Sequence, residues 1–159
     1  MASDTTRDET LTVRLALPDE RGALEALQWR ASLMWEETRE ALLAHPDAIQ
    51  LPAEQIAEGR VFVCERGGSV VGFAVVVPRE DGDAELDGLF VEPVAWRSGA
   101  GTRLVAEAER LAVRWGASIL HVIANKRALD FYRARDFHIV GQAQTRFGPA
   151  IAMEKELRG

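Results

Sequence analysis

The sequence predicts a mixed α/β domain with a central sheet of about seven strands, mostly antiparallel, and helices on both faces. Short segments of alternating or continuous apolar residues, typical of strands, occur on either side of longer segments with helical periodicity. Three strand segments follow one another through short polar turns, which indicates antiparallel neighbours. With 159 residues and 47% hydrophobic content, the chain can bury a substantial core. We expect a single domain at residues 11–159, after a flexible segment at residues 1–10.

The first predicted elements are a strand and a helical region. Residues 11–17 alternate leucine or valine with polar or small residues and stop at Pro18, which predicts a strand followed by a helix N-terminus. Residues 21–45 are helix-forming throughout, and Pro46 ends them. Two helices that separate near Leu33 fit this region better than one.

The middle of the chain predicts a helical turn and three strands. The helical turn is expected between Pro52 and Gly59. Two apolar segments then flank a pair of glycines, which predicts a β-hairpin, and a third apolar segment follows a polar turn. The helical turn is expected at residues 53–58 and the strands at residues 61–65, 69–77 and 84–91.

The last third of the chain predicts a strand, a helix and a closing hairpin. Residues 118–124 are nearly all apolar, as in a central strand that is covered on both faces. Asn125 is expected to cap a helix at residues 126–135, and residues 137–144 and 150–157 are expected to form the hairpin. The predicted order is β-αα-βββ-α-β-α-ββ, without an internal repeat.

The loop before the longest helix has the pattern of a phosphate-binding site. The strand that ends at Val91 runs into Pro93, and a Gly-Ala-Gly sequence at residues 99–101 then opens an amphipathic helix at residues 102–115. Main-chain N–H groups of residues with little bulk can approach an anion closely. A helix N-terminus adds unpaired donors and the positive end of the helix dipole.

The helix behind this loop is well specified. Leu104, Ala108, Leu111 and Trp115 recur on one face, and Gly116 follows as a C-terminal cap. A tight strand-to-helix turn without a ligand explains the glycines equally well. The spacing does not suit a dinucleotide-binding fold, because no acidic residue ends the next strand, and a P-loop is excluded because Gly-Lys-Ser/Thr is absent.

The charge of the chain limits its partners. The formal net charge of -6 and the pI near 5.1 argue against nucleic acid or an anionic membrane as the main partner. An anionic ligand needs a local basic patch, which Arg97, Arg103, Lys126 and Arg127 are placed to supply. The first ten residues lack the apolar core of a signal peptide, and no segment approaches the ~20 apolar residues of a membrane span. We therefore expect a cytoplasmic protein.

Cysteine and histidine chemistry is not expected to carry the function. The single cysteine, Cys64, cannot form an internal disulfide, and its apolar neighbours predict a buried side chain rather than a nucleophile. His45, His121 and His138 are scattered without the spacing of metal ligands. We predict no metal.

Two segments together match one family, over about a third of the chain. The first has Val91-Glu92-Pro93, followed at the helix start by Gly99-Ala100-Gly101. The second, at residues 125–137, reads Asn-x-x-Ala-x-x-Phe-Tyr and ends in Asp-Phe. Both resemble the motifs of the GCN5-related N-acetyltransferases (the GNAT family), and they stand at the separation that the family requires.

The sequence departs from the family pattern at two positions. Trp96 stands where the family has arginine or glutamine, and an arginine follows one position later as Arg97. Asp136 stands where glycine is usual, at a helix end that needs the left-handed conformation, which aspartate tolerates at some cost.

The resemblance implies that coenzyme A binds at the glycine-bearing loop. In the family, backbone amides hold the pyrophosphate. The pantetheine arm inserts like a strand between the fourth and fifth strands, which splay apart. Gly88 is the residue most able to permit a bulge there. The implied cofactor-binding residues are Leu89, Phe90, Val91, Arg97, Ser98, Gly99, Ala100, Gly101, Thr102, Arg103 and Asn125.

The resemblance also implies catalytic residues. Tyr132 matches the tyrosine that donates a proton or hydrogen bond to the leaving thiolate, a general-acid task. The alternative is a core aromatic, since Ala128 and Tyr132 lie at helical spacing. A carboxylate near the start of the loop strand is expected to act as the base, with Asp87 as the first choice and Glu85 as the second. The alternative is a pair of solvated carboxylates on an exposed strand.

The function implied is transfer of an acetyl group from acetyl-CoA to a primary amine, by direct attack and without a covalent enzyme intermediate. The alternative is a sensor or regulatory domain that binds an acyl-CoA without turnover. The acceptor, a small-molecule or peptide amine, cannot be read from the sequence. The helical segment with Trp29, Trp35 and Arg39 and the hairpin near Phe147 are expected to select it. A homodimer paired through edge strands is also expected.

Overall fold

The computed structural model describes residues 10–145 and 148–158. The predicted flexible segment therefore lies, apart from Thr10, outside the described residues. The strands are β1 (Leu11–Leu15), β2 (Val61–Arg66), β3 (Ser69–Pro78), β4 (Ala84–Val91), β5 (Ile119–Ala124), β6 (His138–Thr145) and β7 (Gly148–Glu156). The helices are α2 (Arg21–Leu33), α3 (Glu36–Ala44), α4 (Ala53–Ala57), α5 (Ala100–Arg114) and α6 (Leu129–Arg133), with short 3-10 turns at Pro18–Glu20, Pro93–Ala95 and Lys126–Ala128.

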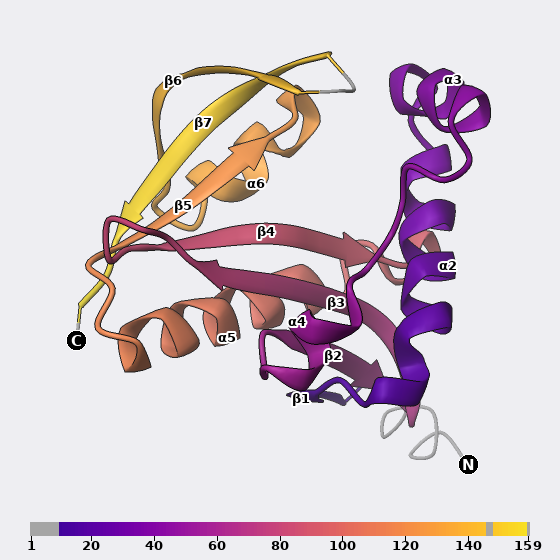
Figure 1. Ribbon diagram of the computed structural model, residues 1–159, viewed down its shortest axis with the longest axis horizontal. Helices are drawn as coiled ribbons and strands as arrows, with labels where there is room; N and C mark the ends of the chain where they lie inside the picture. Colours follow the sequence, from indigo (N-terminus) through magenta and orange to yellow (C-terminus); the bar gives the residue numbers. More distant parts are fainter. Residues whose placement is uncertain (1–9, 146–147, 159) are drawn as a thin grey trace. The chain divides into compact units, whose positions relative to one another are not determined.

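The strands form one seven-stranded sheet in the order β1-β2-β3-β4-β5-β7-β6 (Figure 1). The pairs β1–β2, β2–β3, β5–β7 and β6–β7 are antiparallel, and β4 pairs with β5 in parallel. This architecture confirms the predicted mixed α/β fold class and the predicted order of elements. The sheet falls into two compact parts, which we describe separately. The first part contains the residues up to Val75 together with Gly88–Glu107, and the second contains Val76–Asp87 together with the residues from Ala108 onwards.

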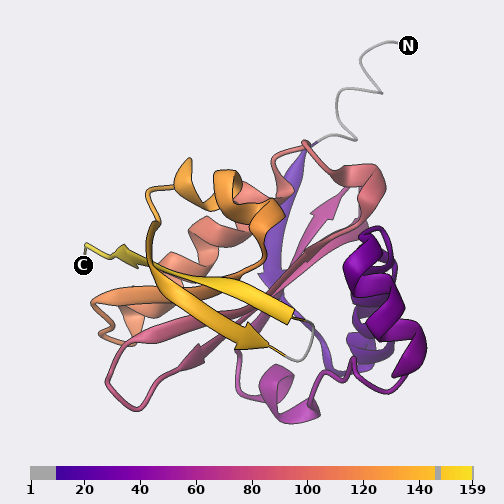
Figure 2. The same cartoon turned by 90° about the horizontal axis from the view of Figure 1, so that it is seen from above.

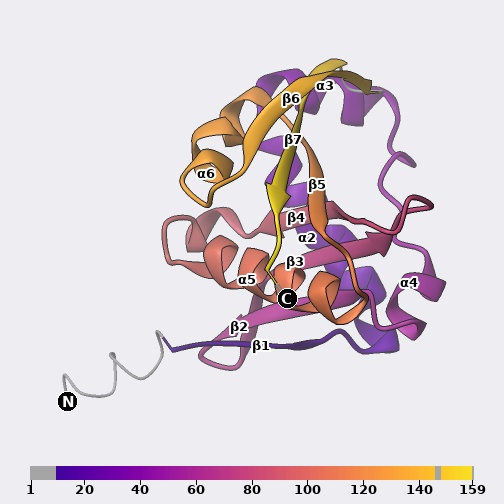
Figure 3. The same ribbon diagram turned by 90° about the vertical axis from the view of Figure 1, so that its left-hand side faces the viewer.

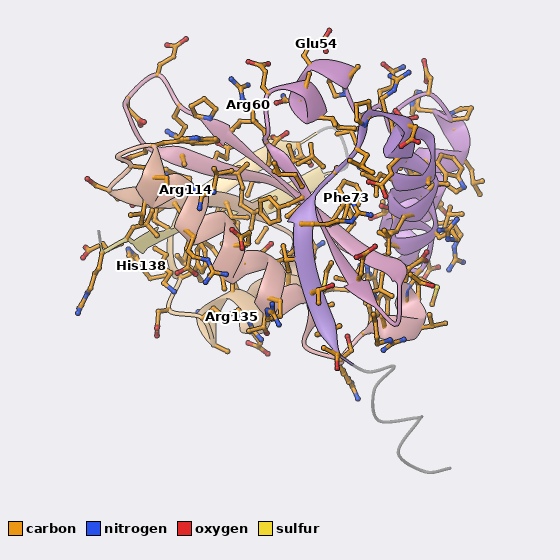
Figure 4. All side chains as sticks on the ribbon, turned by 90° about the horizontal axis from the view of Figure 1, so that it is seen from below. Glu54, Arg60, Phe73, Arg114, Arg135 and His138 are labelled. Atoms are coloured by element: carbon orange, nitrogen blue, oxygen red, sulfur yellow. The ribbon has the colours of Figure 1, made fainter. Side chains whose placement is uncertain are left out.

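In the first part, the core forms around β2. The side chains of its first four residues, Val61–Cys64, are all buried, as expected where helices cover both faces of a strand. Phe73 of β3 is fully buried (Figure 4), and β1 lies along β2 (Figure 2). Helix α2 buries Leu24 and Leu27 against this core, at the spacing of one helical face.

The first part also confirms one boundary and corrects another. Two helices do separate after Leu33, since α3 begins only at Glu36. The first strand, however, ends at Leu15 instead of Leu17, and Leu17 is 52% exposed. Pro18 opens a 3-10 turn, so the chain leaves the ladder before the alternating pattern stops.

In the second part, β5, β7 and β6 run side by side (Figure 3). The closing hairpin is confirmed, although its turn at residues 146–147 lies outside the described residues. The prediction that β5 is covered on both faces is wrong, because Ile123 is 44% exposed. The helix expected at residues 126–135 begins as a 3-10 turn and ends at Arg133.

Helix α5 begins at Ala100, earlier than the sequence predicts. Leu104, Ala108 and Leu111 are buried as expected. Trp115 is not, since it is 37% exposed and lies beyond the helix end at Arg114. Gly116 has a φ of 86°, and the N–H of Ala117 bonds to the carbonyl of Ala112 at 3.0 Å, which is a glycine-terminated helix end. No helix among the described residues has the length and apolar character to cross a membrane.

Candidate active site

Residues 93–101, which we call the amide loop, connect β4 to α5 in the first part. After the turn at Pro93–Ala95, Arg97 has a φ of 67° and Gly99 a φ of 93°. Glycine adopts such a conformation without strain, whereas arginine does so only where its surroundings enforce it. Ala95 and Ala100 are 1% exposed each, so both ends of the loop's C-terminal half are anchored in the core.

The amide loop presents open donors. The N–H of Ala100 bonds to Oγ of Ser98 at 3.3 Å, and the N–H of Arg103 bonds to the carbonyl of Gly99 at 3.0 Å. Among the described residues, the N–H groups of Gly99 and Gly101 have no acceptor. Two unpaired amides at the N-terminus of a fifteen-residue helix are the donors that an anion needs.

Helix α5 is fixed where it leaves the loop. Its Leu104 packs at Gly72 of β3, where an added Cβ would lie 3.1 Å from Cδ1 of Leu104 and 3.0 Å from the carbonyl oxygen of Phe90. A side chain at Gly72 would push the helix away. The glycine therefore lets the first turns of α5 lie close against the sheet.

The aromatic and basic side chains expected around the amide loop have different surroundings. Trp96 donates from Nε1 to the carbonyl of Val91 at 2.9 Å and stacks on Trp35, with ring centroids 5.1 Å apart and an interplanar angle of 6°. Arg97 is exposed, while Nη1 of Arg103 donates to the carbonyl of Leu11 at 3.1 Å. Lys126 and Arg127 are exposed in the second part.

Strand β4 pairs with β5 only at its beginning. The parallel ladder joins Ala84–Leu86 to Leu120–Val122 and stops there. Beyond it, the N–H of Glu92 bonds to the carbonyl of Val71 in β3 at 2.7 Å, so this end of β4 stays attached to β3. A ladder that ends at Leu86 is what the predicted splaying of the fourth and fifth strands requires.

The two candidate bases lie two residues apart on β4 but in different surroundings. Glu85 accepts from Nη1 of Arg79 at 3.1 Å, so its charge is already paired. Asp87 has no ion-pair partner among the described residues. Asp87 as a whole is exposed, but the protein around its carboxyl group removes part of the water. This desolvation raises the pKa of Asp87 above its ordinary value. This arrangement favours Asp87 over Glu85 as a base.

Tyr132 lies in α6 with its ring in an aromatic cluster. It is 5% exposed and meets Phe131 and Phe137 edge to face, at centroid distances of 5.1 and 5.3 Å. Burial raises the pKa of Tyr132 far above its usual value, and the positive charge of Arg135 partly opposes that shift. No described residue hydrogen-bonds to the hydroxyl. The hydroxyl is therefore protonated at neutral pH and free to donate.

The backbone around Tyr132 is fixed at both ends. Oδ1 of Asn125 accepts from the N–H of Ala128 at 3.0 Å, which confirms the predicted cap. Asp136 has a φ of 71°, which confirms the left-handed position, and the N–H of Phe137 bonds to the carbonyl of Tyr132 at 3.1 Å. Asn125 thus acts on the backbone of this turn, and its predicted contact with a cofactor stays a prediction.

Arg135 braces the same turn. Its Nη1 donates to the carbonyl of Phe131 at 2.6 Å, and its Cζ lies 3.8 Å from the centroid of the Phe131 ring. This contact is a cation–π interaction. Sequence reasoning missed it, because the motif specifies no residue at that position.

Cys64 and His121 have surroundings that suit structural roles. Cys64 is fully buried, and burial raises the pKa of its thiol, which agrees with a structural role. The histidines show no ligand spacing in the sequence, but in the structure Nε2 of His121 lies 3.0 Å from Oδ2 of Asp83, and potential ligand atoms of Asp81, Asp83 and His121 lie within 4.8 Å of one another. Arg79 already pairs with Asp81 at 3.2 Å, and the N–H of Asp83 donates to Oδ1 of Asp81 at 2.9 Å, so these side chains hold the turn before β4.

Comparisons with known proteins point to one family. A family model described as the acetyltransferase (GNAT) family matches residues 24–137. An uncharacterized N-acetyltransferase of Mycobacterium tuberculosis is 30% identical over 101 residues, and so is one of Mycobacterium bovis. The match covers 60% of this chain and spans about 65% of the length of those relatives.

Solved structures give the same result for the fold. A GCN5-related N-acetyltransferase from Rhodopseudomonas palustris is 26% identical, with a TM-score of 0.75 over 93% of this chain and 96% of that one. The PaiA N-acetyltransferase from Thermoplasma acidophilum, solved in complex with coenzyme A, is 17% identical, with a TM-score of 0.73 over 92% of this chain and 99% of that one.

Proposed function

The chain belongs to the acetyltransferase (GNAT) family, a family of acetyl-CoA-dependent acyltransferases, and from this premise we propose that it transfers an acetyl group from acetyl-CoA to a primary amine. The observation that carries the proposal is the pair of open amides at Gly99 and Gly101, at the start of α5. We take residues 11–159 as one catalytic domain. The acceptor is proposed to be a small-molecule or peptide amine.

In this proposal, the amide loop binds the pyrophosphate of coenzyme A. Residues 97–102 surround the phosphate oxygens, the N–H groups of Gly99 and Gly101 donate to them, and the exposed Arg97 adds positive charge. Residues 89–91 of β4, beyond the end of the β5 ladder at Leu86, pair with the pantetheine arm. Among these residues the backbone does most of the binding, which explains how Trp96 can replace the usual basic side chain.

The chemistry assigned to the side chains is proton transfer. Asp87 takes a proton from the ammonium form of the acceptor, directly or through water, so that the amine nitrogen can attack the thioester carbonyl. The nitrogen–carbon bond forms as the carbonyl becomes an oxyanion, and backbone N–H groups of β4 stabilise that charge. The oxyanion then re-forms the carbonyl as the carbon–sulfur bond breaks, and Tyr132 gives its proton to the leaving thiolate. The attacking nitrogen, now part of the amide, loses its second proton, which restores the Tyr132 hydroxyl.

Replacing the base tests its role through pH dependence. Asp87→Asn is expected to lower kcat/KM by ~10²-fold, as for loss of a general base. Because the pKa of Asp87 is raised, the wild-type rate should fall as the pH drops through a value above the ordinary aspartate range. The variant should lack this acidic limb in a profile of kcat/KM against pH.

Stability separates this role from a structural one. Folding raises the pKa of Asp87, so the ionised carboxylate costs stability above the folded-state pKa, and the cost vanishes as the pH falls below the unfolded-state pKa. Asp87→Asn should therefore be at least as stable as wild type at neutral pH. A kcat/KM within about twofold of wild type and an unchanged acidic limb would remove Asp87 from the mechanism.

The alternative is a sensor that binds an acyl-CoA without turnover. Within the described part of the chain, the Tyr132 hydroxyl has no hydrogen-bond partner and the Asp87 carboxylate no ion-pair partner. Both favour the enzyme, because a sensor has no use for either. Thiol release from acetyl-CoA, measured with a panel of small amines and peptide N-termini, separates the two. The enzyme predicts amine-dependent release, whereas binding of coenzyme A without release for any amine would support the sensor.

We also propose a homodimer paired through an edge strand. Strand β6 ends the sheet and exposes Ile139 and Val140, at 42% and 50%. An edge with free backbone groups and apolar side chains can pair with a second copy. Analytical ultracentrifugation should show a mass above the monomer that rises with concentration. A monomer at every concentration would contradict the dimer.

A further inference from the structure

Two contacts join the amide loop to the helices α2 and α3, all within the first part. Arg30 of α2 donates two hydrogen bonds to the carboxylate of Glu92, just before the loop. Nε lies 3.1 Å from Oε1 and Nη2 lies 2.5 Å from Oε2. Trp35, between α2 and α3, stacks on Trp96 inside the loop. The helical segment therefore holds the loop itself at Trp96 and the chain directly before the loop at Glu92.

Trp96 is held more firmly than its exposure explains. It is 37% exposed, so burial alone does not fix its orientation. Its indole N–H is bound to the carbonyl of Val91 at 2.9 Å, and its face is covered by Trp35 in a nearly parallel stack. Both interactions act on one ring, which leaves the side chain of Trp96 a single orientation.

That orientation matters because the strained residue comes next. Arg97 has a φ of 67°, which a non-glycine residue keeps only when its neighbours enforce it. The contacts of Trp96 fix the chain on the N-terminal side of Arg97, and α5 fixes it on the C-terminal side. A loop that is already ordered does not have to lose conformational entropy when its ligand binds.

Trp35 is also braced on its own side. It is the residue before α3, its carbonyl accepts from the N–H of Arg39 at 2.8 Å, and Nε of Arg39 donates to the carbonyl of Leu33 at 2.9 Å. The bend between α2 and α3 is thus a hydrogen-bonded unit that can hold Trp35 in place. This bend supplies the rigid support against which Trp96 stacks.

We propose that the Trp35–Trp96 stack holds the amide loop in its binding conformation, so that Trp35 is a positioning residue for coenzyme A. The inference rests on the proposed function. A stacked aromatic pair shifts a conformational equilibrium by about two- to tenfold. The apparent Kd for a ligand equals the intrinsic Kd divided by the fraction of molecules in the binding conformation, so it rises when that fraction falls. The stack thereby stabilises the loop for binding at a position where the family has arginine or glutamine.

The test is the affinity of the full chain for coenzyme A, measured by calorimetry. Trp35→Ala should raise the Kd about three- to tenfold, while Trp35→Phe, which keeps a stacked ring, should stay within about twofold of wild type. The exciton signal of the paired indoles in circular dichroism should disappear in both. Trp115→Ala is the matched control, since Trp115 is also 37% exposed but belongs to the second part, and its Kd should not change.

A second variant makes the test independent of how Trp35→Ala folds. Trp96→Gln introduces a residue that the family commonly has here, yet it should weaken binding, because the stack is lost. In the double variant Trp35→Ala/Trp96→Gln, the Kd should be no higher than in the weaker-binding single variant, since both remove the same interaction.

The outcomes are distinct. Additive losses in the double variant, or a Kd for Trp35→Ala within about twofold of wild type after the exciton signal is lost, would overturn the positioning role and leave the proposed function intact. A wild-type protein that does not bind coenzyme A would overturn the proposed function and this inference with it.

Discussion

A Gly101→Val protein is expected to bind coenzyme A at least tenfold more weakly than wild type, a loss of more than ~1.4 kcal/mol. Gly101 is the second residue of α5, and its N–H is open. A branched side chain there would stand where phosphate oxygens approach the amides, while the helical backbone tolerates valine. Calorimetry with coenzyme A measures the effect directly.

The control is Ala106→Val in the same helix. Ala106 is exposed and lies past the first turn of α5, so this variant adds the same branched side chain away from the open amides. Its affinity should match that of wild type. An unchanged Kd in a folded Gly101→Val protein would show that the amide loop does not bind the phosphates.

Tyr132→Phe is expected to lower kcat by one to three decades, on the order of a general-acid contribution. The ring stays in the aromatic cluster with Phe131 and Phe137, and the hydroxyl that is removed leaves no hydrogen-bond partner unsatisfied among the residues that the structure describes. Stability should therefore change little. Turnover is measured where chemistry is rate-limiting, because slow product release would hide the effect.

Two further measurements sharpen this result. Tyr132 is the only tyrosine of the chain, so ultraviolet titration reports its ionisation alone and should show a pKa raised above the ordinary tyrosine value. Phe131→Leu disturbs the same cluster without removing the hydroxyl. It should lower the melting temperature, while kcat should change little compared with Tyr132→Phe. A Tyr132→Phe rate within about twofold of wild type would make Tyr132 a core residue.

The elements set by local signals could be predicted from the sequence. Strand β4 has the predicted bounds, and the cap at Asn125 and the left-handed Asp136 follow from residues within a few positions of each other. The errors occur where an element ends. Trp115 continues the helical pattern, but Gly116 ends the helix there, so its side chain meets solvent. Leu17 continues the strand pattern, but Pro18 turns the chain away.

The candidate site was predictable only in part, for the same reason. Gly99 and Gly101 predicted the open amides, because a glycine has no side chain that could shield its own N–H group from a ligand. The stack of Trp35 on Trp96 and the pairing of Arg79 with Glu85 depend on which segments meet in space, and no local pattern reports that. The departure at Trp96 from the family motif marks an unusual residue, but it does not identify Trp35 as its partner.

The measurement that tests acetyl transfer most directly is the product balance with isotopically labelled acetyl-CoA. We expect mass spectrometry to find the label on the nitrogen of at least one amine from the panel, with one thiol released per acetylated amine. Gly101→Val and Tyr132→Phe should lower both quantities together. A wild-type protein that binds coenzyme A but yields neither labelled amine nor thiol with any amine of the panel would contradict the proposed enzyme.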